Sequence, residues 1–232
     1  MIKILALGNS FSQDATAYLQ PLCKDAYVRN LDIGGCSLER HANNLTKKTP
    51  DYHFEENGVA VLQGVTANEM IASEKWDFIT VQQVSGLSGV AESYEPHIGV
   101  VLAKLRALCP SAKIVFHQTW SYAKERMPYA GETYGGEQKT MDEKIRSAVE
   151  TVTEKYRLPR IETGEYIRKI RDCGEFENAP LYRDGYHLSF EYGRYVAALA
   201  WAKFFGLSVD ESFTPENADK KICEKLRAYI FQ

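Results

Sequence analysis

The stretch IKILALGNSFS, residues 2–12, joins a short apolar run directly to a polar turn and a segment with helical spacing. Residues 2–7 predict a buried strand, and the residues after Ser12 predict a helix. In an open parallel α/β sheet, ligands bind in the crevice outside the carboxyl ends of the strands. Ser10 stands at such an end, so we predict that its hydroxyl is a nucleophile facing this crevice.

The rest of the chain repeats the alternation of strand and helix. The predicted strands cover residues 2–7, 28–33, 76–82, 113–117 and 158–162. Strands that alternate with helices indicate a parallel sheet covered on both faces. We expect a five-stranded α/β sheet in the order 2-1-3-4-5, which places the first strand centrally and opens the crevice beside Ser10.

No linker, internal repeat or low-complexity segment divides the 232 residues, so we expect a single domain over residues 1–232. Residues 50–64 predict a small β-hairpin insertion around the turn Glu56-Asn57-Gly58. Residues 215–232 predict a C-terminal amphipathic helix. The connection over residues 118–136 is long and rich in tyrosine, and long connections in compact domains are usually functional or mobile.

Composition excludes several classes of function. The net charge of −3, without a basic block, predicts no nucleic-acid partner. The five cysteines form no C-x-x-C pair, and we expect no metal and no cofactor, because the sequence has neither metal-ligand spacing nor a phosphate-binding glycine motif. No apolar run is long enough to span a bilayer, and no signal peptide precedes the first strand, so we expect no membrane association and a cytoplasmic location. A periplasmic or secreted protein that has lost its signal peptide would begin in the same way.

A second motif near the other end supplies what a serine nucleophile needs. Arg183-Asp184-Gly185-Tyr186-His187 places an Asp and a His three residues apart in one turn. A serine hydroxyl is activated by a base that takes its proton and by a third group that orients the base. We predict that His187 is the base and Asp184 the orienting carboxylate, although a helix cap at Ser10 and an Asx-turn at Asp184 are the ordinary alternatives.

Further candidates follow from the chemistry of ester cleavage. The tetrahedral intermediate needs hydrogen-bond donors, and we expect the backbone N–H groups of Ser10 and Gly35 to supply two of them, since glycine lets the backbone approach a ligand closely. His117 and Trp120 follow the fourth strand at the expected crevice. Both are candidate substrate contacts, with Trp120 as a platform for a sugar ring, although a structural role is the ordinary alternative for a His at a strand end.

The motifs GNSFS (residues 8–12), GGCS (34–37) and DGYH (184–187), in this order, resemble the SGNH (GDSL-like) hydrolase superfamily. The chain looks most like uncharacterised SGNH-type domains of gut Bacteroidetes, over residues 2 to about 206. The resemblance implies a three-layer α/β/α flavodoxin-like fold. It also implies a third oxyanion donor after the third strand, where the family has an Asn and this chain has Gln82-Gln83. We favour Gln83, and the register of the strand decides between the two.

Together these features predict a serine esterase, an SGNH-type carboxylesterase with a Ser-His-Asp triad and an oxyanion hole. The resemblance favours a short acyl ester as substrate, with carbohydrate O-deacetylation as the main expectation. The alternatives are a lipid esterase or lysophospholipase of the same superfamily and a non-catalytic ligand-binding module. A flavin-binding flavodoxin relative is a third alternative, whereas the absence of G-x-S-x-G around Ser10 disfavours an α/β-hydrolase. The acyl chain, the alcohol and the oligomeric state stay open.

Overall fold

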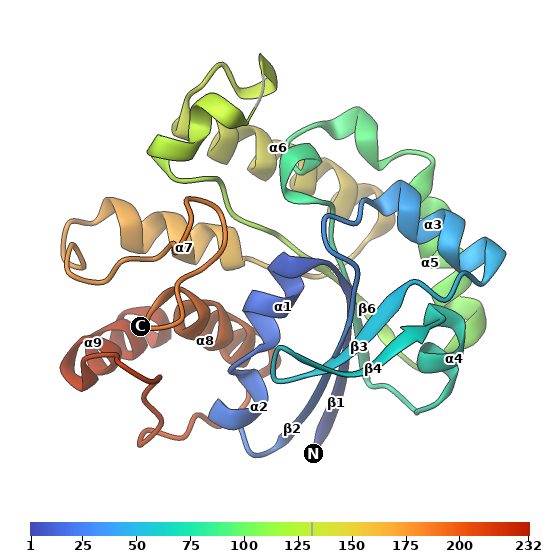
Figure 1. Ribbon diagram of the computed structural model, residues 1–232, viewed down its shortest axis with the longest axis horizontal. Coiled ribbons are helices and arrows are strands. Elements are labelled where there is room, and N and C mark those ends of the chain that lie inside the picture. The colour runs from blue at the N-terminus through green and yellow to red at the C-terminus, as the bar shows by residue number, and fades with distance from the viewer. Residues whose placement is uncertain (131) are drawn as a thin grey trace.

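A mixed β-sheet runs through the middle of the computed structural model, which describes residues 1–130 and 132–232 (Figure 1). Residue 131, inside the predicted long connection, lies outside the described residues. The sheet has seven strands in the order β4-β3-β2-β1-β5-β6-β7. Their bounds are β1 (Ile2–Gly8), β2 (Ala26–Asp32), β3 (Tyr52–Glu56), β4 (Val59–Val65), β5 (Phe78–Val81), β6 (Lys113–His117) and β7 (Arg160–Ile161).

The predicted parallel core is present, but the sheet is larger than predicted. Strands β2-β1-β5-β6-β7 are all parallel and follow the predicted order 2-1-3-4-5. The expectation of five parallel strands is wrong because the predicted hairpin joins the sheet: β3 pairs antiparallel with β2, and β4 pairs antiparallel with β3. The free edge of β2 thereby finds partners for its backbone N–H and C=O groups.

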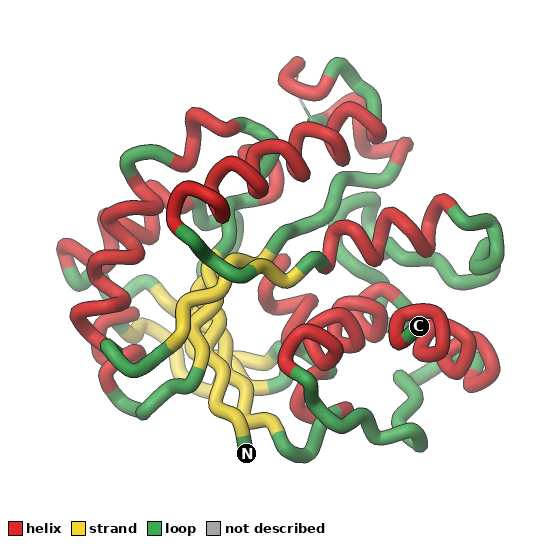
Figure 2. The backbone as a smooth tube through the Cα atoms, turned by 180° about the vertical axis from the view of Figure 1, so that it is seen from behind, coloured by secondary structure: helices red, strands yellow, loops and turns green. Residues whose placement is uncertain are grey.

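Helices cover both faces of the sheet, as Figure 2 shows from behind. The C-terminal helix is shorter than predicted, because it begins at Lys220 behind the side-chain cap of Asp219. The α-helices are α1 (Ser10–Thr16), α2 (Leu19–Leu22), α3 (Leu38–Lys47), α4 (Ala67–Ala72), α5 (His97–Leu108), α6 (Gln138–Tyr156), α7 (Thr163–Asp172), α8 (Gly193–Phe205) and α9 (Lys220–Phe231). Short 3₁₀ helices are η1 (Ser85–Leu87), η2 (Ala91–Tyr94), η3 (Lys124–Tyr129) and η4 (Glu132–Tyr134).

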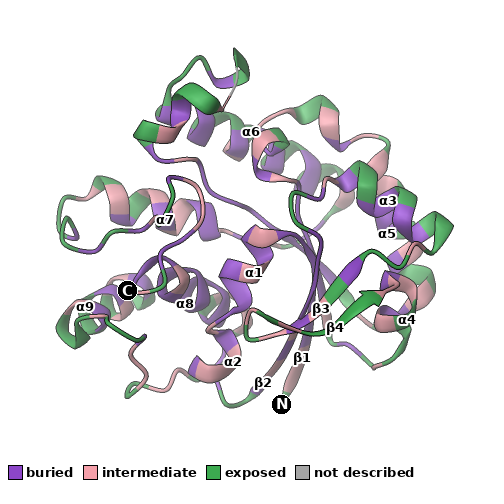
Figure 3. Ribbon diagram, viewed as in Figure 1, coloured by how far each residue is buried: buried purple, intermediate pink, exposed green. Residues whose placement is uncertain are grey.

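The central strand β1 separates two apolar cores. Ile4 and Ala6 face the layer of α1, α2, α7, α8 and α9, whereas Leu5 and Leu7 face the layer of α3, α4, α5 and α6. Alternate strand residues point to opposite faces, so a strand buried on both sides is apolar throughout. Buried residues accordingly gather toward the sheet, and exposed residues lie on the outer sides of peripheral helices such as α3 and α9 (Figure 3).

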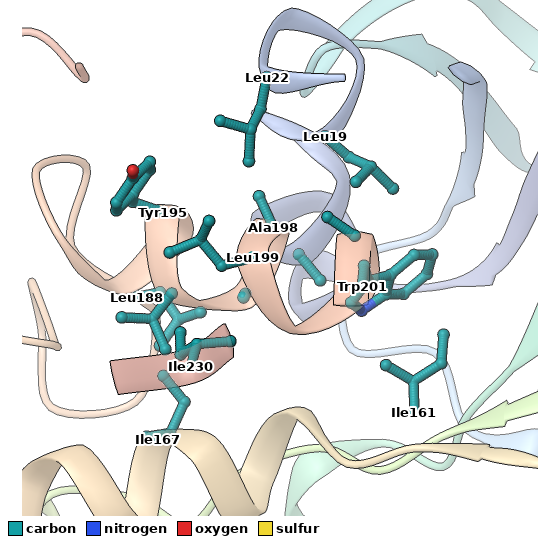
Figure 4. Close-up of a cluster of buried hydrophobic side chains, with 14 of the residues drawn as sticks. Leu19, Leu22, Ile161, Ile167, Leu188, Tyr195, Ala198, Leu199, Trp201 and Ile230 are labelled. Carbon is teal, nitrogen blue, oxygen red and sulfur yellow. The ribbon is translucent and has the colours of Figure 1, made fainter. Parts of the chain in front are cut away.

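Helix α8 is the central helix of the first layer. Its residues 195–202 are all buried, because α1, α7 and α9 pack around it. In Figure 4, Leu199 and Trp201 of α8 lie within this cluster between Leu19 of α2 and Ile167 of α7. Because α1 packs against α8, the start of α1 lies close to the segment that precedes α8.

A close backbone approach at Gly164 provides a test of the contact between α7 and the segment after β6. A Cβ at Gly164 would lie 2.1 Å from the carbonyl oxygen of Thr119, so we expect Gly164→Ala to lower the free energy of unfolding by about 2 to 3 kcal/mol. A Cβ at Gly34 would have no described atom within 4 Å, so Gly34→Ala should change that free energy by less than about 0.5 kcal/mol. Urea denaturation measures both, and equal stabilities would contradict the packing.

Candidate active site

Ser10 lies at the junction of β1 and α1, where the sequence predicts it. The preceding residue, Asn9, caps α1: its Oδ1 accepts from the N–H of Phe11 at 3.0 Å. Its Nδ2 donates to the carbonyl of Cys36, also at 3.0 Å. Gly8 allows the turn to close, because a Cβ there would lie 2.4 Å from the Oγ of Ser12. The turn under Ser10 is therefore held from β1, from α1 and from the segment after β2.

The structure brings the three predicted triad residues into one hydrogen-bonded chain. His187 Nε2 lies 2.9 Å from Ser10 Oγ, and His187 Nδ1 lies 2.6 Å from Asp184 Oδ2. The carboxylate accepts, so Nδ1 carries the proton, and Nε2 is then free to accept the hydroxyl proton of Ser10. The arrangement has the order of a nucleophile, a base and an orienting carboxylate.

The turn that carries Asp184 also keeps this carboxyl group ionised. Asp184 Oδ1 accepts from the backbone N–H groups of Tyr186 at 3.2 Å and His187 at 2.8 Å. Partial burial opposes ionisation, but the hydrogen bonds from the His187 ring and from these two N–H groups outweigh it. They hold the pKa of Asp184 below its usual value. A charged Asp184 is what stabilises a proton on the far side of the imidazole.

Trp120 is buried inside the protein, contrary to the prediction that it forms a platform for a sugar ring. Its side chain is only 1% exposed and stacks on Phe11, with ring centroids 4.4 Å apart. Its indole Nε1 donates to the backbone carbonyl of Tyr186 at 2.8 Å. The residue is internal because α1 covers it, and it supports the turn that carries His187.

His117 is also internal, so the prediction that it contacts the substrate is wrong as well. It is 1% exposed, and both ring nitrogens have partners: Nδ1 lies 2.7 Å from Gln82 Oε1, and Nε2 lies 3.0 Å from Thr163 Oγ1. Burial lowers the pKa of His117 to about 3, so the ring is neutral. The amide oxygen of Gln82 is an acceptor, so the ring donates to it from Nδ1 and accepts from Thr163.

The preference for Gln83 as third oxyanion donor does not fit the geometry. Gln83 Nε2 donates to both O and Oγ of Ser93, and Oε1 accepts from the N–H groups of Leu38 and Val84. Both Nε2 hydrogens of Gln83 are therefore already bonded to Ser93, so neither is available to an oxyanion at Ser10. The sequence could not exclude this, since adjacent residues at a strand end point in opposite directions and the register alone chooses between them.

Gln82 is the amide that lies beside the Ser10 turn. Its Nε2 donates to Asn9 Oδ1 at 2.8 Å, and its Cδ would lie 3.1 Å from a Cβ at Gly8. The second Nε2 hydrogen has no acceptor among the described residues. The backbone N–H groups of Ser10 and Gly35 likewise make no hydrogen bond with the described residues, and Gly35 adopts a positive φ of 64° in an exposed turn.

A buried carboxyl group that the sequence analysis missed lies at the end of β2. Asp32 pairs with Gly8 across the parallel ladder and is 7% exposed, and its Oδ1 has no hydrogen-bond partner within the described part of the chain. Burial, with a contribution from the charge of Glu55, raises the pKa of Asp32 to about 7. Its position as the last polar residue of a predicted strand was the only signal in the sequence.

A cavity that none of Ser10, Asp184 and His187 lines lies elsewhere in the molecule. It has a volume of about 690 Å³ and lies between α6 and α7, where its lining includes Asp142, Arg146, Arg168 and Arg171. These arginines already pair with Asp142, Glu165 and Asp172. Within the described residues, no three His, Cys, Asp or Glu side chains are grouped to hold a metal ion. Nor is any described helix long and apolar enough to cross a membrane.

Comparison with known proteins places the chain in a family. A family model described as a domain of unknown function, DUF4886, matches residues 3–231. The chain belongs to the DUF4886 family. A crystal structure of a DUF4886 family protein from Bacteroides uniformis has a TM-score of 0.86 and 33% sequence identity, covering 99% of this chain and 95% of that one. No curated protein matches the sequence significantly.

More distant solved structures share the fold of this DUF4886 protein. A putative SGNH hydrolase from Slackia heliotrinireducens has a TM-score of 0.60 and 24% identity, with 88% of this chain and 99% of that chain covered. Axe2, an acetylxylan esterase from Geobacillus stearothermophilus, has a TM-score of 0.57 and 14% identity, with 89% and 95% covered. The resemblance to SGNH/GDSL-like proteins is thereby confirmed, and at these identities it is a likeness of fold.

The buried Asp32 makes a prediction about stability against pH. Its pKa rises on folding from about 3.8 to about 7, so the folded state holds the proton more tightly, and the free energy of unfolding falls as the pH rises between these values. The full loss from this group is about 4 kcal/mol. Asp32→Asn should therefore be more stable than wild type at pH 8 and nearly equal at pH 4, by urea denaturation. A stability difference that does not vary with pH would contradict the assignment.

Proposed function

We propose that this DUF4886 protein is a serine esterase that removes an acetyl or another short acyl group from a carbohydrate. The observation that carries the proposal is the continuous hydrogen-bonded chain from Ser10 Oγ through His187 to Asp184. The likeness of fold to a putative SGNH hydrolase and to an acetylxylan esterase supports the same reaction class.

In the acylation step, Ser10 Oγ attacks the ester carbonyl carbon while His187 Nε2 takes the hydroxyl proton. His187 then gives this proton to the alcohol oxygen as the carbon–oxygen bond to the alcohol breaks, which leaves the acyl group on Ser10. Asp184 Oδ2 keeps the Nδ1 proton in place, so the imidazole has the correct tautomer and its positive charge is stabilised.

Deacylation repeats these roles with water. His187 removes a proton from the water that attacks the acyl carbon, and it returns the proton to Ser10 Oγ as the acid leaves. Charge builds on the former carbonyl oxygen in both steps. We assign its stabilisation to the N–H groups of Ser10 and Gly35. The Gln82 side chain is only 1% exposed, so we assign its amide the role of holding Asn9, and with it the Ser10 turn, in place.

An aromatic surface beside the triad fits a sugar better than the buried Trp120 does. The half-buried Tyr186 ring lies 4.0 Å from the His187 ring, centroid to centroid, and Tyr122 lies 5.5 Å from Tyr186. The Tyr122 hydroxyl lies 3.0 Å from Ser85 Oγ. Aromatic faces with hydroxyl groups at their edges offer both the apolar and the polar contacts that a sugar ring takes.

The nucleophile is tested first. Ser10→Ala should abolish hydrolysis of p-nitrophenyl acetate and labelling by a fluorophosphonate probe, because no other described serine has a histidine at hydrogen-bond distance. Ser147→Ala, at an exposed position on α6, is the matched control and should retain both. Labelling that persists in Ser10→Ala would refute the nucleophile, and a wild type without labelling or turnover would favour a ligand-binding module.

The two neighbouring glutamines provide the second test. Gln82→Ala should lower kcat by about a hundredfold, because Asn9 loses the hydrogen bond that holds the Ser10 turn in place. Gln83→Ala should instead lower thermal stability, because Leu38, Val84 and Ser93 lose their partner, while kcat of the folded protein changes little. Steady-state kinetics with p-nitrophenyl acetate, alongside thermal melts, separates the two variants. A larger fall of kcat in Gln83→Ala than in Gln82→Ala would support Gln83 as an oxyanion donor.

A further inference from the structure

A buried carboxylate lies one helical turn beyond the candidate nucleophile. Asp14 follows Ser10 by four residues on α1, so both side chains lie on the same face of the helix. Asp14 is 0% exposed. A carboxylate out of water is stable only with charged or hydrogen-bonding partners, so its contacts identify what it does.

The partners of Asp14 flank the turn that carries Asp184 and His187. Arg183 Nη1 donates to Oδ1 at 2.9 Å and to Oδ2 at 3.1 Å, and the backbone N–H of Leu188 donates to Oδ2 at 2.8 Å. Residue 183 immediately precedes Asp184, and residue 188 immediately follows His187. One carboxylate therefore binds both ends of the four-residue segment 184–187.

The same contacts also close the segment on itself. Arg183 Nη1 donates to the backbone carbonyl of Leu188, and the N–H of Arg183 donates to the carbonyl of His187 at 3.0 Å. Arg194 of α8 donates to Asp14 Oδ1 at 2.8 Å and completes the charge pairing from the other side. Four hydrogen bonds from Arg183, Leu188 and Arg194 occupy the carboxylate, which leaves Asp14 no part in proton transfer.

We propose that Asp14 is a positioning residue that sets the distance between Ser10 and His187. The inference rests on the proposed esterase function. Ser10 and Asp14 belong to one rigid helical turn, and Asp14 holds both ends of the His187 turn, so the carboxylate places the base against the nucleophile. A misplacement of about 1 Å in a reacting group can cost about a hundredfold in rate, so a contact of this kind affects the reaction without touching the substrate.

The test uses Asp14→Asn, which keeps the shape of the side chain and removes its charge. We expect kcat for p-nitrophenyl acetate to fall about a hundredfold while KM changes less than about threefold, and fluorophosphonate labelling of Ser10 to slow by a similar factor. Arg183→Gln should show the same pattern, and it leaves Asp14 paired with Arg194 if Asp14→Asn does not fold.

A merely structural role is excluded by a destabilised reference variant. Ile71→Ala truncates a buried side chain of α4, in the opposite helical layer, and should lower stability without lowering kcat. The proton on His187 Nδ1 gives a readout that needs no substrate: its downfield ¹H NMR resonance should be present in wild type and Ile71→Ala and displaced or lost in Asp14→Asn.

An unchanged kcat and an unchanged resonance in folded Asp14→Asn would overturn the proposal, as would an equal fall of kcat in Ile71→Ala. If wild-type protein hydrolyses no ester, the esterase function fails and the resonance alone decides. Its loss in Asp14→Asn would still support positioning of His187, and its persistence would refute it.

Discussion

The parallel pairing of β1 between β2 and β5 is the constraint on which the rest of the structure depends. It buries β1 on both faces, so each helical layer packs against one set of its alternating side chains. It also aligns the carboxyl ends of three strands at one edge. Ser10, Asp32 and Gln82 follow or end these strands, which is why the candidate nucleophile, the buried acid and the amide lie close together there.

Helix α8 connects this edge to the other end of the chain. Its apolar residues are buried by α1, α7 and α9, so the segment just before α8 must lie over the start of α1. Apolar packing brings the turn of residues 184–187 close to α1, and hydrogen bonds then fix its position. Asp14 accepts a hydrogen bond from the N–H of Leu188, at the end of the turn of residues 184–187, and Trp120 donates one to the carbonyl of Tyr186 within it. The hydrogen bond between Ser10 and His187 is thus supported by two independent contacts with α1 and the loop after β6.

A buried hydrogen-bonded chain stands behind the candidate oxyanion site. Neutral His117 orients the amide of Gln82, and this amide in turn contacts Asn9, the residue before Ser10. Two glutamines follow β5 where the SGNH pattern has an Asn, and their side chains have different partners. Gln83 links the backbone of Leu38 to Ser93, whereas Gln82 contacts Asn9 in the Ser10 turn. A longer amide at this position requires a partner to restrain it, and His117 is that partner.

The sequence by itself determined the parallel strands, the hairpin and the three residues that form the hydrogen-bonded chain, Ser10, His187 and Asp184, because each depends on local signals: apolar periodicity, turn residues, and short motifs at strand ends. Tertiary structure alone decided that the hairpin extends the sheet, that Trp120 and His117 are internal, and that Gln82 rather than Gln83 faces Ser10. Each of these depends on which distant segment covers a side chain. Asp14 is the clearest case, since its partners lie some 170 residues away in the chain and the sequence around Asp14 does not predict them.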